Sequence, residues 1–170
     1  MNDEIFDIVN TNDEVIGQLP RRIVHRDGHL HRAVHVLVFN AAGSVFLQKR
    51  SLLKDTFPGA WDSSASGHLE SGESYDACAR RELLEELNLT VTTPPEPLFK
   101  IPACPETGAE FVWAYRCRSE GPFQLPPEEI ERGDWYTPAE VTDWVARRPG
   151  DFATGFIVIW KQFTTQAKRS

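Results

Sequence analysis

The chain has 170 residues, of which 41% are hydrophobic and 25% are charged, and its formal net charge is −7. These values are typical of one folded domain over residues 1–170. The negative charge argues against a nucleic acid polymer as partner. Because no window of 18 apolar residues occurs, neither a transmembrane helix nor a membrane partner is expected. The acidic N-terminus is unlike an export signal and the three cysteines show no metal-binding spacing, so we expect a cytoplasmic protein with free thiols.

Short strands are predicted over residues 4–9 and 15–19, so that about the first 20 residues form a small N-terminal arm. An apolar run over 34–39, a turn over 40–43 and a second run over 44–48 predict a hairpin. The segment 73–87 is the strongest predicted helix, and strands are predicted over 98–103 and 111–117.

Two further helices are predicted near the end of the chain. Thr137 as N-cap and Pro138 in the first turn predict a helix that ends at about residue 147, and residues 154–167 predict a closing helix. The order of strands and helices is typical of an α/β fold in which a mixed β-sheet lies between helices.

The helix over 73–87 has two contrasting faces. Three leucines within an arc of about 100° are predicted to meet the core: Leu83, Leu84 and Leu87. Three carboxylates are predicted on the opposite side: Glu82, Glu85 and Glu86. Because these acids repel one another near a helix C-terminus, a cation is expected beside them. Mg²⁺, which binds carboxylates, waters and substrate phosphates, is the natural choice.

Residues 67–89, GHLESGESYDACARRELLEELNL, resemble the Nudix box, G-x5-E-x7-R-E-U-x-E-E-x-G-U, where U is a bulky aliphatic residue. The matching residues are Gly67, Glu73, Arg81, Glu82, Leu83, Glu85, Glu86 and Leu89. A chance match has a probability of about 10⁻⁵ on average residue frequencies. Asn88 replaces the last glycine of the pattern, and because Asn also adopts left-handed backbone, we expect it to end the helix.

The resemblance implies a Nudix α/β/α sandwich and a hydrolase that cleaves a nucleoside diphosphate linked to another moiety, with a divalent metal. It implies that Glu82 and Glu86 are the main ligands of Mg²⁺, for which Mn²⁺ substitutes. Glu85 is implied as a further ligand or a group that orients water, and the carbonyl of Gly67 as completing the coordination.

Further residues are implied around this metal. Glu73 and Arg81 are implied to pair, so that Arg81 holds the carboxylates in place. Glu129, in a segment over 129–135 that we expect to be a loop, is implied as another metal ligand or the catalytic base. Three basic residues are candidates for binding the diphosphate, with an ordinary surface charge as the alternative for each: Arg32, Arg50 and Lys54.

Segments 28–33, 48–51, 54–61 and 67–68 resemble a Nudix subgroup related to type I isopentenyl-diphosphate isomerase. That enzyme is implied to hold a metal with three histidines and two glutamates, for which the counterparts here are His25, His31, His68 and Glu110. A structural role is the alternative for each histidine. Ser66 stands at the position of the isomerase cysteine and Gly108 at that of the second glutamate. A serine hydroxyl is a poor proton donor near neutral pH, so isomerase activity is the less favoured alternative.

We therefore expect a metal-dependent hydrolase of diphosphate linkages that acts on small nucleoside di- or triphosphates. A nucleotide-binding sensor without turnover is a third possibility, disfavoured because the box acids and Arg81 are all present. The base, the sugar, the number of metal ions and the oligomeric state do not follow from these residues.

Overall fold

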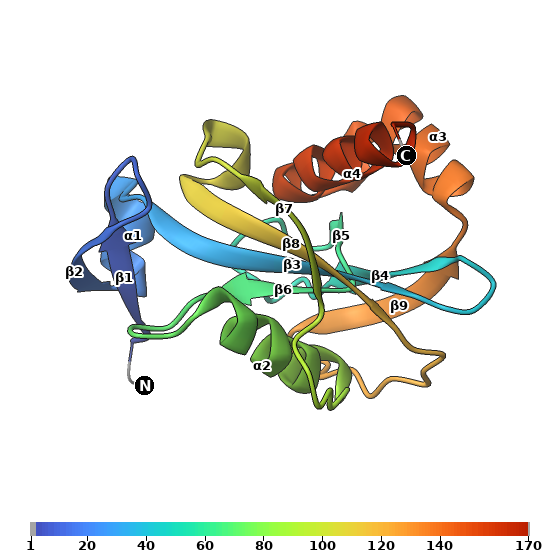
Figure 1. Ribbon diagram of the computed structural model, residues 1–170, viewed down its shortest axis with the longest axis horizontal. Helices are drawn as coiled ribbons and strands as arrows, with labels where there is room; N and C mark the ends of the chain where they lie inside the picture. Colours follow the sequence, from blue (N-terminus) through green and yellow to red (C-terminus); the bar gives the residue numbers. More distant parts are fainter. Residues whose placement is uncertain (1–2, 170) are drawn as a thin grey trace.

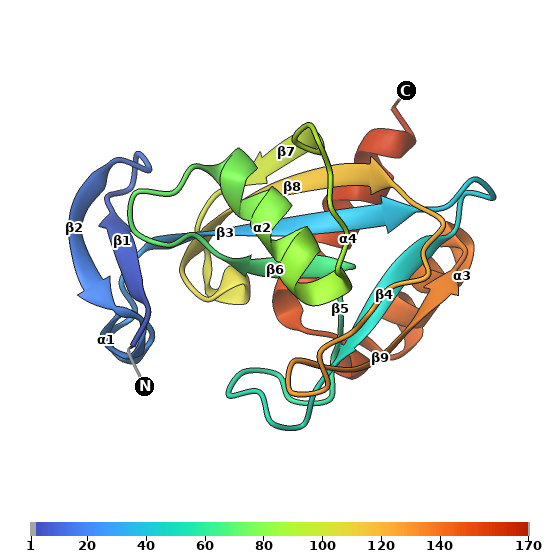
Figure 2. The same ribbon diagram turned by 90° about the horizontal axis from the view of Figure 1, so that it is seen from below.

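The computed structural model describes residues 3–169, and its strands form a two-stranded hairpin and a seven-stranded mixed sheet (Figures 1 and 2). The strands are β1 (Ile5–Val9), β2 (Val15–Pro20), β3 (His31–Phe39), β4 (Val45–Arg50), β5 (Trp61–Asp62), β6 (Ala65–His68), β7 (Glu96–Ile101), β8 (Glu110–Arg118) and β9 (Ile130–Tyr136). The α-helices are α1 (Arg21–Asp27), α2 (Tyr75–Leu87), α3 (Pro138–Arg147) and α4 (Thr154–Ala167), and the two 3₁₀ turns are η1 (Pro105–Thr107) and η2 (Pro149–Asp151).

Strand β3 lies at the centre of the large sheet. It pairs in parallel with β8 along its whole length, and β8 pairs antiparallel with β7. On its other edge β3 changes partner, because residues 33–36 pair with β6 whereas residues 38–39 pair with β4. Strand β4 then pairs with both β5 and β9. This arrangement brings the strand that carries Gly67 beside the first half of β3.

Helices cover both faces of this sheet, as the α/β/α prediction requires. Figure 1 shows α2 below the sheet and α3 and α4 above it. The core under α2 includes Val34, Val36, Leu83 and Leu87, and the core under α3 and α4 includes Leu37, Leu47, Val141, Phe156 and Trp160. Alternate residues of β3 therefore point into different cores, which explains its nearly continuous apolar sequence. None of the helices within residues 3–169 is long and apolar enough to cross a membrane.

The predicted elements are largely confirmed, including the hairpin of β3 and β4 and the helix that Thr137 caps by accepting from the N–H of Glu140. Asn88 has left-handed backbone (φ 53°, ψ 35°) and ends α2, as expected. The expectation that 129–135 is a loop is wrong, because residues 130–136 form β9. Gly133 hid this strand: a Cβ there would lie 2.2 Å from Phe46 Cζ, so the strand needs a residue that sequence patterns read as a breaker.

The expected faces of α2 also need correction. Leu83 and Leu87 are buried, but Leu84 is 48% exposed and does not meet the core. Glu82 and Glu86 are buried instead, while Glu85 is exposed. The buried face of α2 is thus wider than the leucine stripe and includes two of the three carboxylates, because the helix packs beside a polar cleft as well as against the sheet.

The N-terminal arm consists of β1, β2 and α1, the last of which was not predicted. Asp13, at the turn of the hairpin, fastens the arm to the sheet and to α2. Its carboxylate accepts hydrogen bonds from Arg32 Nε (2.6 Å), from Lys100 Nζ and from the Tyr75 hydroxyl (2.7 Å). These contacts hold the hairpin against the sheet, and α1, which carries His25, follows directly after β2.

Candidate functional site

A cleft of about 850 Å³ lies between the arm, strand β6, helix α2 and the start of α4. Three acids of α2 line it: Glu82, Glu85 and Glu86. From other elements it is lined by His25, His35, His68 and Glu110. The backbone of Gly155, near the first residue of α4, also faces it. The cleft therefore contains three groups of polar residues, which are described in turn below.

Glu86 is buried in the first group, and both of its carboxylate oxygens are held. The N–H of Ser66 donates to Oε1 at 2.7 Å, and Gln48 Nε2 donates to Oε2 at 3.2 Å. Burial raises the pKa of Glu86 to about 7, although both hydrogen bonds oppose the shift. The side chain is therefore fixed in a place where its charged form needs a cation nearby.

Glu82 depends on the glycine that opens the box. A Cβ on Gly67 would lie 2.0 Å from Oε1 of Glu82, so any other residue at position 67 would displace this carboxylate. Burial, and next the charge of Glu86, raise the pKa of Glu82 well above its ordinary value. Gly67 on β6 thus allows the close approach of Glu82 to the strand.

Arg81 links the acids of the box. Its Nε and Nη2 donate to the two oxygens of Glu73, at 2.8 and 2.9 Å, and its Nη1 donates to Glu82 (2.8 Å) and Glu85 (3.1 Å). Nη2 also donates to the carbonyl of His68. The hydrogen bonds to Glu73 raise the pKa of Arg81 further, which keeps the guanidinium charged. The expected pairing of Glu73 with Arg81 is present, and the catalytic roles of the two residues remain predictions.

This group of acids fits a hard divalent cation. Among the described residues, the ion pairs of Glu82 and Glu85 both go to Arg81, and Glu86 is held by neutral donors. Glu73, Glu82 and Glu85 thus share one guanidinium, and Glu86 has no ion-pair partner among the described residues. The remaining negative charge and the oxygen donors suit Mg²⁺ or Mn²⁺.

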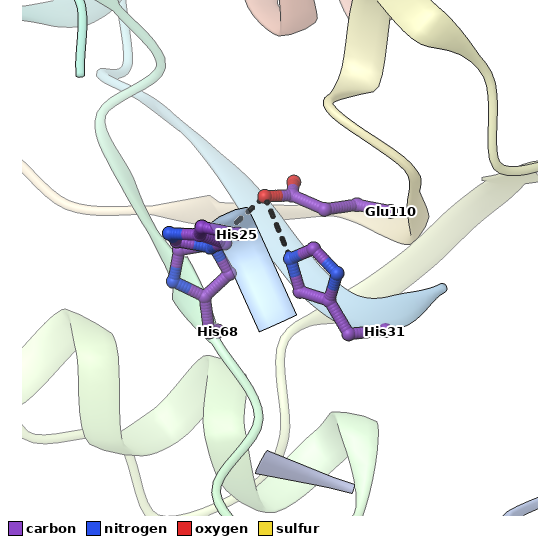
Figure 3. A group of neighbouring side chains, drawn as sticks. All are labelled: His25, His31, His68 and Glu110. Carbon is purple, nitrogen blue, oxygen red and sulfur yellow. Dashed lines mark hydrogen bonds and ion pairs between the residues drawn. The ribbon is translucent and has the colours of Figure 1, made fainter. Parts of the chain in front are cut away.

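The second group contains three histidines and one acid, and Figure 3 shows their side chains pointing toward one another. His25 comes from α1, His31 from β3, His68 from β6 and Glu110 from β8. One ligand atom of each lies within 4.8 Å of the others. The strand register brings three of them together, because His31 lies opposite Glu110, and Ala33, two residues along β3, lies opposite His68. The four residues are hereafter called the histidine cluster.

Glu110 joins two members of the histidine cluster. Its Oε1 lies 2.7 Å from His68 Nε2 and 3.4 Å from His31 Nε2. The buried His31 Nε2 nevertheless has no hydrogen-bond partner among the described residues, because the 3.4 Å contact is not oriented as a hydrogen bond. A buried polar atom without a partner is costly, and a metal ion would satisfy the lone pair of a neutral imidazole.

The electrostatics of the histidine cluster differ from those of the acids on α2. Burial, and next the neighbouring rings of His68 and His31, lower the pKa of His25 to about 4. Burial alone would raise the pKa of Glu110, but His68 and His31 hold it below its ordinary value. His25 is thus neutral and Glu110 ionised near pH 7, which are the forms that ligate metals.

The structure brings two of the three predicted phosphate-binding cations to the cleft. Arg50 and Lys54 line it, together with Glu129, which forms an ion pair with Lys54. Arg32 does not line it, because its guanidinium donates to the side chain and the carbonyl of Asp13 at the arm. No short-range pattern indicates this contact, because the two residues are 19 positions apart.

The third group, around His35, was missed by sequence reasoning. His35 is 7% exposed, and its Nδ1 lies 2.8 Å from Ser63 Oγ and 3.7 Å from Asp62 Oδ1. A histidine within the apolar run 34–39 was the available signal, because that run was otherwise expected to be buried. Gln48 was also missed, although its amide holds Glu86.

Comparisons with known proteins agree on the family. The NUDIX domain matches residues 29–154 of this chain. A curated Nudix hydrolase from Deinococcus radiodurans is 33% identical over 156 residues, which cover 91% of this chain and 90% of the relative. An isopentenyl-diphosphate Δ-isomerase from Serratia proteamaculans is 32% identical over 162 residues, or 94% of this chain and 90% of the relative.

The fold has close counterparts among solved structures. The crystal structure of DR0079 from Deinococcus radiodurans superposes with a TM-score of 0.80 and 31% sequence identity. The match covers 94% of this chain and 98% of the other. The arm, the mixed sheet and the helices on both of its faces are therefore part of a shared architecture.

Proposed function

Because this chain belongs to the Nudix family of hydrolases, which cleave phosphoanhydride bonds, we propose that its substrates are nucleoside di- and triphosphates and that its cofactor is Mg²⁺, with Mn²⁺ as a substitute. The observation that carries the proposal is the burial of Glu82 and Glu86 side by side at the cleft, where Arg81 pairs with Glu82 and only neutral donors hold Glu86. We also propose that the whole chain, residues 1–170, acts as one Nudix domain.

In this proposal Glu82 and Glu86 bind the cation, with Glu85 and the carbonyl of Gly67 as additional oxygen donors. When bound, the ion neutralises charge on the diphosphate and lowers the pKa of a coordinated water. The protein holds the ligands in position: Ser66 N–H and Gln48 fix Glu86, and Arg81 fixes Glu82. Fixed ligands favour the transition state because they need no rearrangement during the reaction.

Arg50 and Lys54 are proposed to bind the phosphate oxygens, since both line the cleft. Glu129 is proposed as a further ligand or the catalytic base; it is paired with Lys54, so substrate binding would have to separate the two charges. Arg32 is no longer a candidate, because Asp13 holds it at the arm.

The experiment is a phosphate-release assay on a panel of nucleoside di- and triphosphates, with products identified by ³¹P NMR. We expect turnover with Mg²⁺ or Mn²⁺, faster above neutral pH because the metal-bound water must lose a proton. EDTA should abolish turnover. Unchanged rates in excess EDTA would contradict the metal assignment, and no hydrolysis of any nucleotide would contradict the substrate class.

A second metal position is proposed at the histidine cluster, on the observation that four ligand atoms converge within 4.8 Å and that His31 Nε2 has no partner among the residues described. Imidazoles favour Zn²⁺, Mn²⁺ or Fe²⁺ over Mg²⁺. Elemental analysis of the purified protein, compared with a His68→Ala variant, tests this position without an activity assay. An equal metal content in the two proteins would contradict it.

Two observations favour isomerase activity as the alternative: the four ligand atoms of the histidine cluster lie close together, and one of the relatives is an isomerase. However, Ser66 stands where the proton-donating thiol would be, and Gly108 where the second glutamate would be. Alkene isomerisation needs an acid on one face of the carbon and a base on the other. Because the proton-donating thiol is absent, we expect no isomerase activity. Incubation with isopentenyl diphosphate and Mg²⁺ tests this; dimethylallyl diphosphate formed at an enzymatic rate would overturn the hydrolase proposal.

A further inference from the structure

The first turn of α4 opens on the cleft without a capping side chain. Its N-cap is Ala153, and Gly155 in the first turn also lacks a polar side chain, whereas Ser74 and Thr137 cap α2 and α3. The first N–H groups of a helix have no partner within the helix, and the helix dipole places partial positive charge there. Ala153, Thr154 and Gly155 all line the cleft.

A buried histidine faces the same place. The side chain of His35 is 9% exposed, and its ring edge lies near Gly155, where a Cβ would meet Nε2 at 3.8 Å and Cε1 at 3.9 Å. The contacts of His35 within residues 3–169 use Nδ1, toward Ser63 and Asp62, so Nε2 has no partner there. Nε2 is thus a polar atom that points into the cleft beside the start of α4.

Nε2 of His35 is a hydrogen-bond donor in two of the three states of the ring, and an acceptor only in the neutral tautomer whose proton is on Nδ1; the proposal below uses the two donor states. When Ser63 donates its hydroxyl proton to Nδ1, the neutral ring carries its own proton on Nε2. When the ring is protonated, Nε2 again carries a proton, and Asp62 lies on the far, Nδ1 side of the ring. The Asp62 carboxylate is itself occupied by the N–H of Ser63 (2.8 Å) and by Arg50 (3.4 Å). In the two donor states, Nε2–H lies beside the start of α4, where the neighbouring carbonyl of Glu106 accepts from Thr154 Oγ1.

We propose that His35 Nε2 and the first turn of α4 form an oxyanion subsite for the terminal phosphate of the substrate, beyond the diphosphate held at Glu82 and Glu86. This proposal rests on the proposed function and makes the substrate a nucleoside triphosphate in preference to a diphosphate. Position supports it: His35 pairs across the sheet with Ser66, whose N–H holds Glu86. The subsite therefore lies one strand away from the residue that positions Glu86, and both line the same cleft.

Phosphate binding without metal is the first test, because it does not depend on hydrolysis. In EDTA, titration with inorganic phosphate followed by calorimetry should show one saturable site. Gly155→Asp should weaken it by about tenfold or more, since a carboxylate would occupy the helix N-terminus, while Gly155→Asn, of equal size, should change it little. A Cβ at position 155 makes only ordinary contacts, at 3.8 Å or more, and an acidic residue in the first turn of a helix is favourable to the helix dipole.

The second test assigns the bound phosphate to the substrate. With Mg²⁺, Gly155→Asp and His35→Leu should raise KM for a nucleoside triphosphate and leave KM for the matching diphosphate nearly unchanged. Absence of saturable phosphate binding, or equal weakening by Gly155→Asp and Gly155→Asn, would overturn the subsite. Equal rises in KM for both nucleotides would overturn its assignment to the terminal phosphate. Hydrolysis by the unmodified protein could persist in each of these cases, so they leave the proposed function standing.

Discussion

The two candidate metal positions of the cleft are built in opposite ways. Glu82, Glu85 and Glu86 lie within one and a half turns of a single helix, so their spacing along the sequence is their spacing in space. The histidine cluster draws one residue from each of α1, β3, β6 and β8, and exists only because the sheet register and the arm bring them together. The first site needs only one helix to form. The second forms only when the arm and the strands of the sheet are all in place.

The electrostatic contrast follows from composition. Glu82 and Glu86 of α2 are buried beside one another, and burial and the charge of Glu86 raise the pKa of Glu82. In the histidine cluster the acid has imidazole partners, and their influence keeps the pKa of Glu110 low despite its burial. The first group has one guanidinium, Arg81, for several carboxylates, and in the second group one nitrogen, His31 Nε2, has no hydrogen-bond partner among the described residues. Separate substitutions should therefore distinguish the two.

The largest effect is expected from Glu86→Gln, which removes a proposed metal ligand used in the transition state. We expect kcat to fall at least about a hundredfold, or about 2.7 kcal/mol of transition-state stabilisation. In EDTA the free energy of unfolding should be no lower than that of the unmodified protein, because a buried charge has been removed. Steady-state kinetics and urea denaturation measure the two quantities. Glu70→Gln, at an exposed acid, is the control, and a near-normal kcat for Glu86→Gln would move the active site elsewhere.

Glu110→Gln tests the other side of the comparison. We expect the affinity for Zn²⁺ or Mn²⁺ at the histidine cluster to fall about 10- to 100-fold, because one anionic ligand is lost. Titration with a competing chelator measures this affinity. The Mg²⁺ affinity at the α2 carboxylates should be unchanged; if it fell in parallel, the two positions would form one site rather than two.

Asp13→Asn should loosen the arm that carries His25. Removal of a buried carboxylate that accepts from Arg32, Lys100 and Tyr75 should cost about 1–2 kcal/mol, less than a fully buried pair because Lys100 is partly exposed. Metal affinity at the histidine cluster should fall, with kcat nearly unchanged. Unfolding free energies and chelator titration measure both, and an unchanged metal affinity would show that the clamp does not position His25.

The effect of Asp13 should also depend on pH in a defined direction. Burial raises the pKa of this carboxyl, but the hydrogen bonds from Lys100, Arg32 and Tyr75 outweigh burial and lower it below its ordinary value of 3.8. A lowered folded-state pKa stabilises the fold above the unfolded pKa, and the benefit is lost as pH falls through the folded value. The stability difference between the unmodified protein and Asp13→Asn should therefore be constant near neutral pH and shrink below about pH 4. A difference that grew in acid would contradict this origin.

The smallest effect is expected at Leu84, on the exposed side of α2. Leu84→Gln should change the free energy of unfolding by less than about 0.5 kcal/mol, whereas Leu83→Ala, at a fully buried neighbour, should cost about 2–5 kcal/mol. Thermal or urea denaturation compares the pair. Similar losses of unfolding free energy at both positions would show that Leu84 meets the core, as the helix pattern predicts.

What could be predicted from the sequence follows the same local rule. The box, its helix, the left-handed Asn88 and the pairing of Glu73 with Arg81 depend on short spacings, and each is present in the structure. Strand β9 was hidden because Gly133 meets Phe46, a contact made with a residue 87 positions earlier. Arg32 was misplaced for a similar reason, since the loop carrying Asp13 folds back onto it.

The burial of Glu82 and Glu86 was the least expected feature. Helical periodicity assigns acids to solvent, and only the tertiary structure shows that α2 borders a polar cleft in which Ser66 and Gln48 supply donors. His35 was overlooked for the converse reason, because an apolar run conceals a polar residue that one element alone cannot explain. Sequence patterns describe single helices and strands, so a site made from several elements cannot be predicted from them until the fold is known.

The position of the arm has a practical consequence for recombinant work. Glu4 lines the cleft, so the arm near residue 4 lies at the rim of the site, whereas α4 ends at Ala167, on the side of the molecule away from the arm in Figure 1. A polyhistidine tag at the N-terminus would bring extra imidazoles beside the histidine cluster and compete with it for metal. Purification, labelling and surface immobilisation are therefore best done through the C-terminus, which leaves the entrance of the cleft clear.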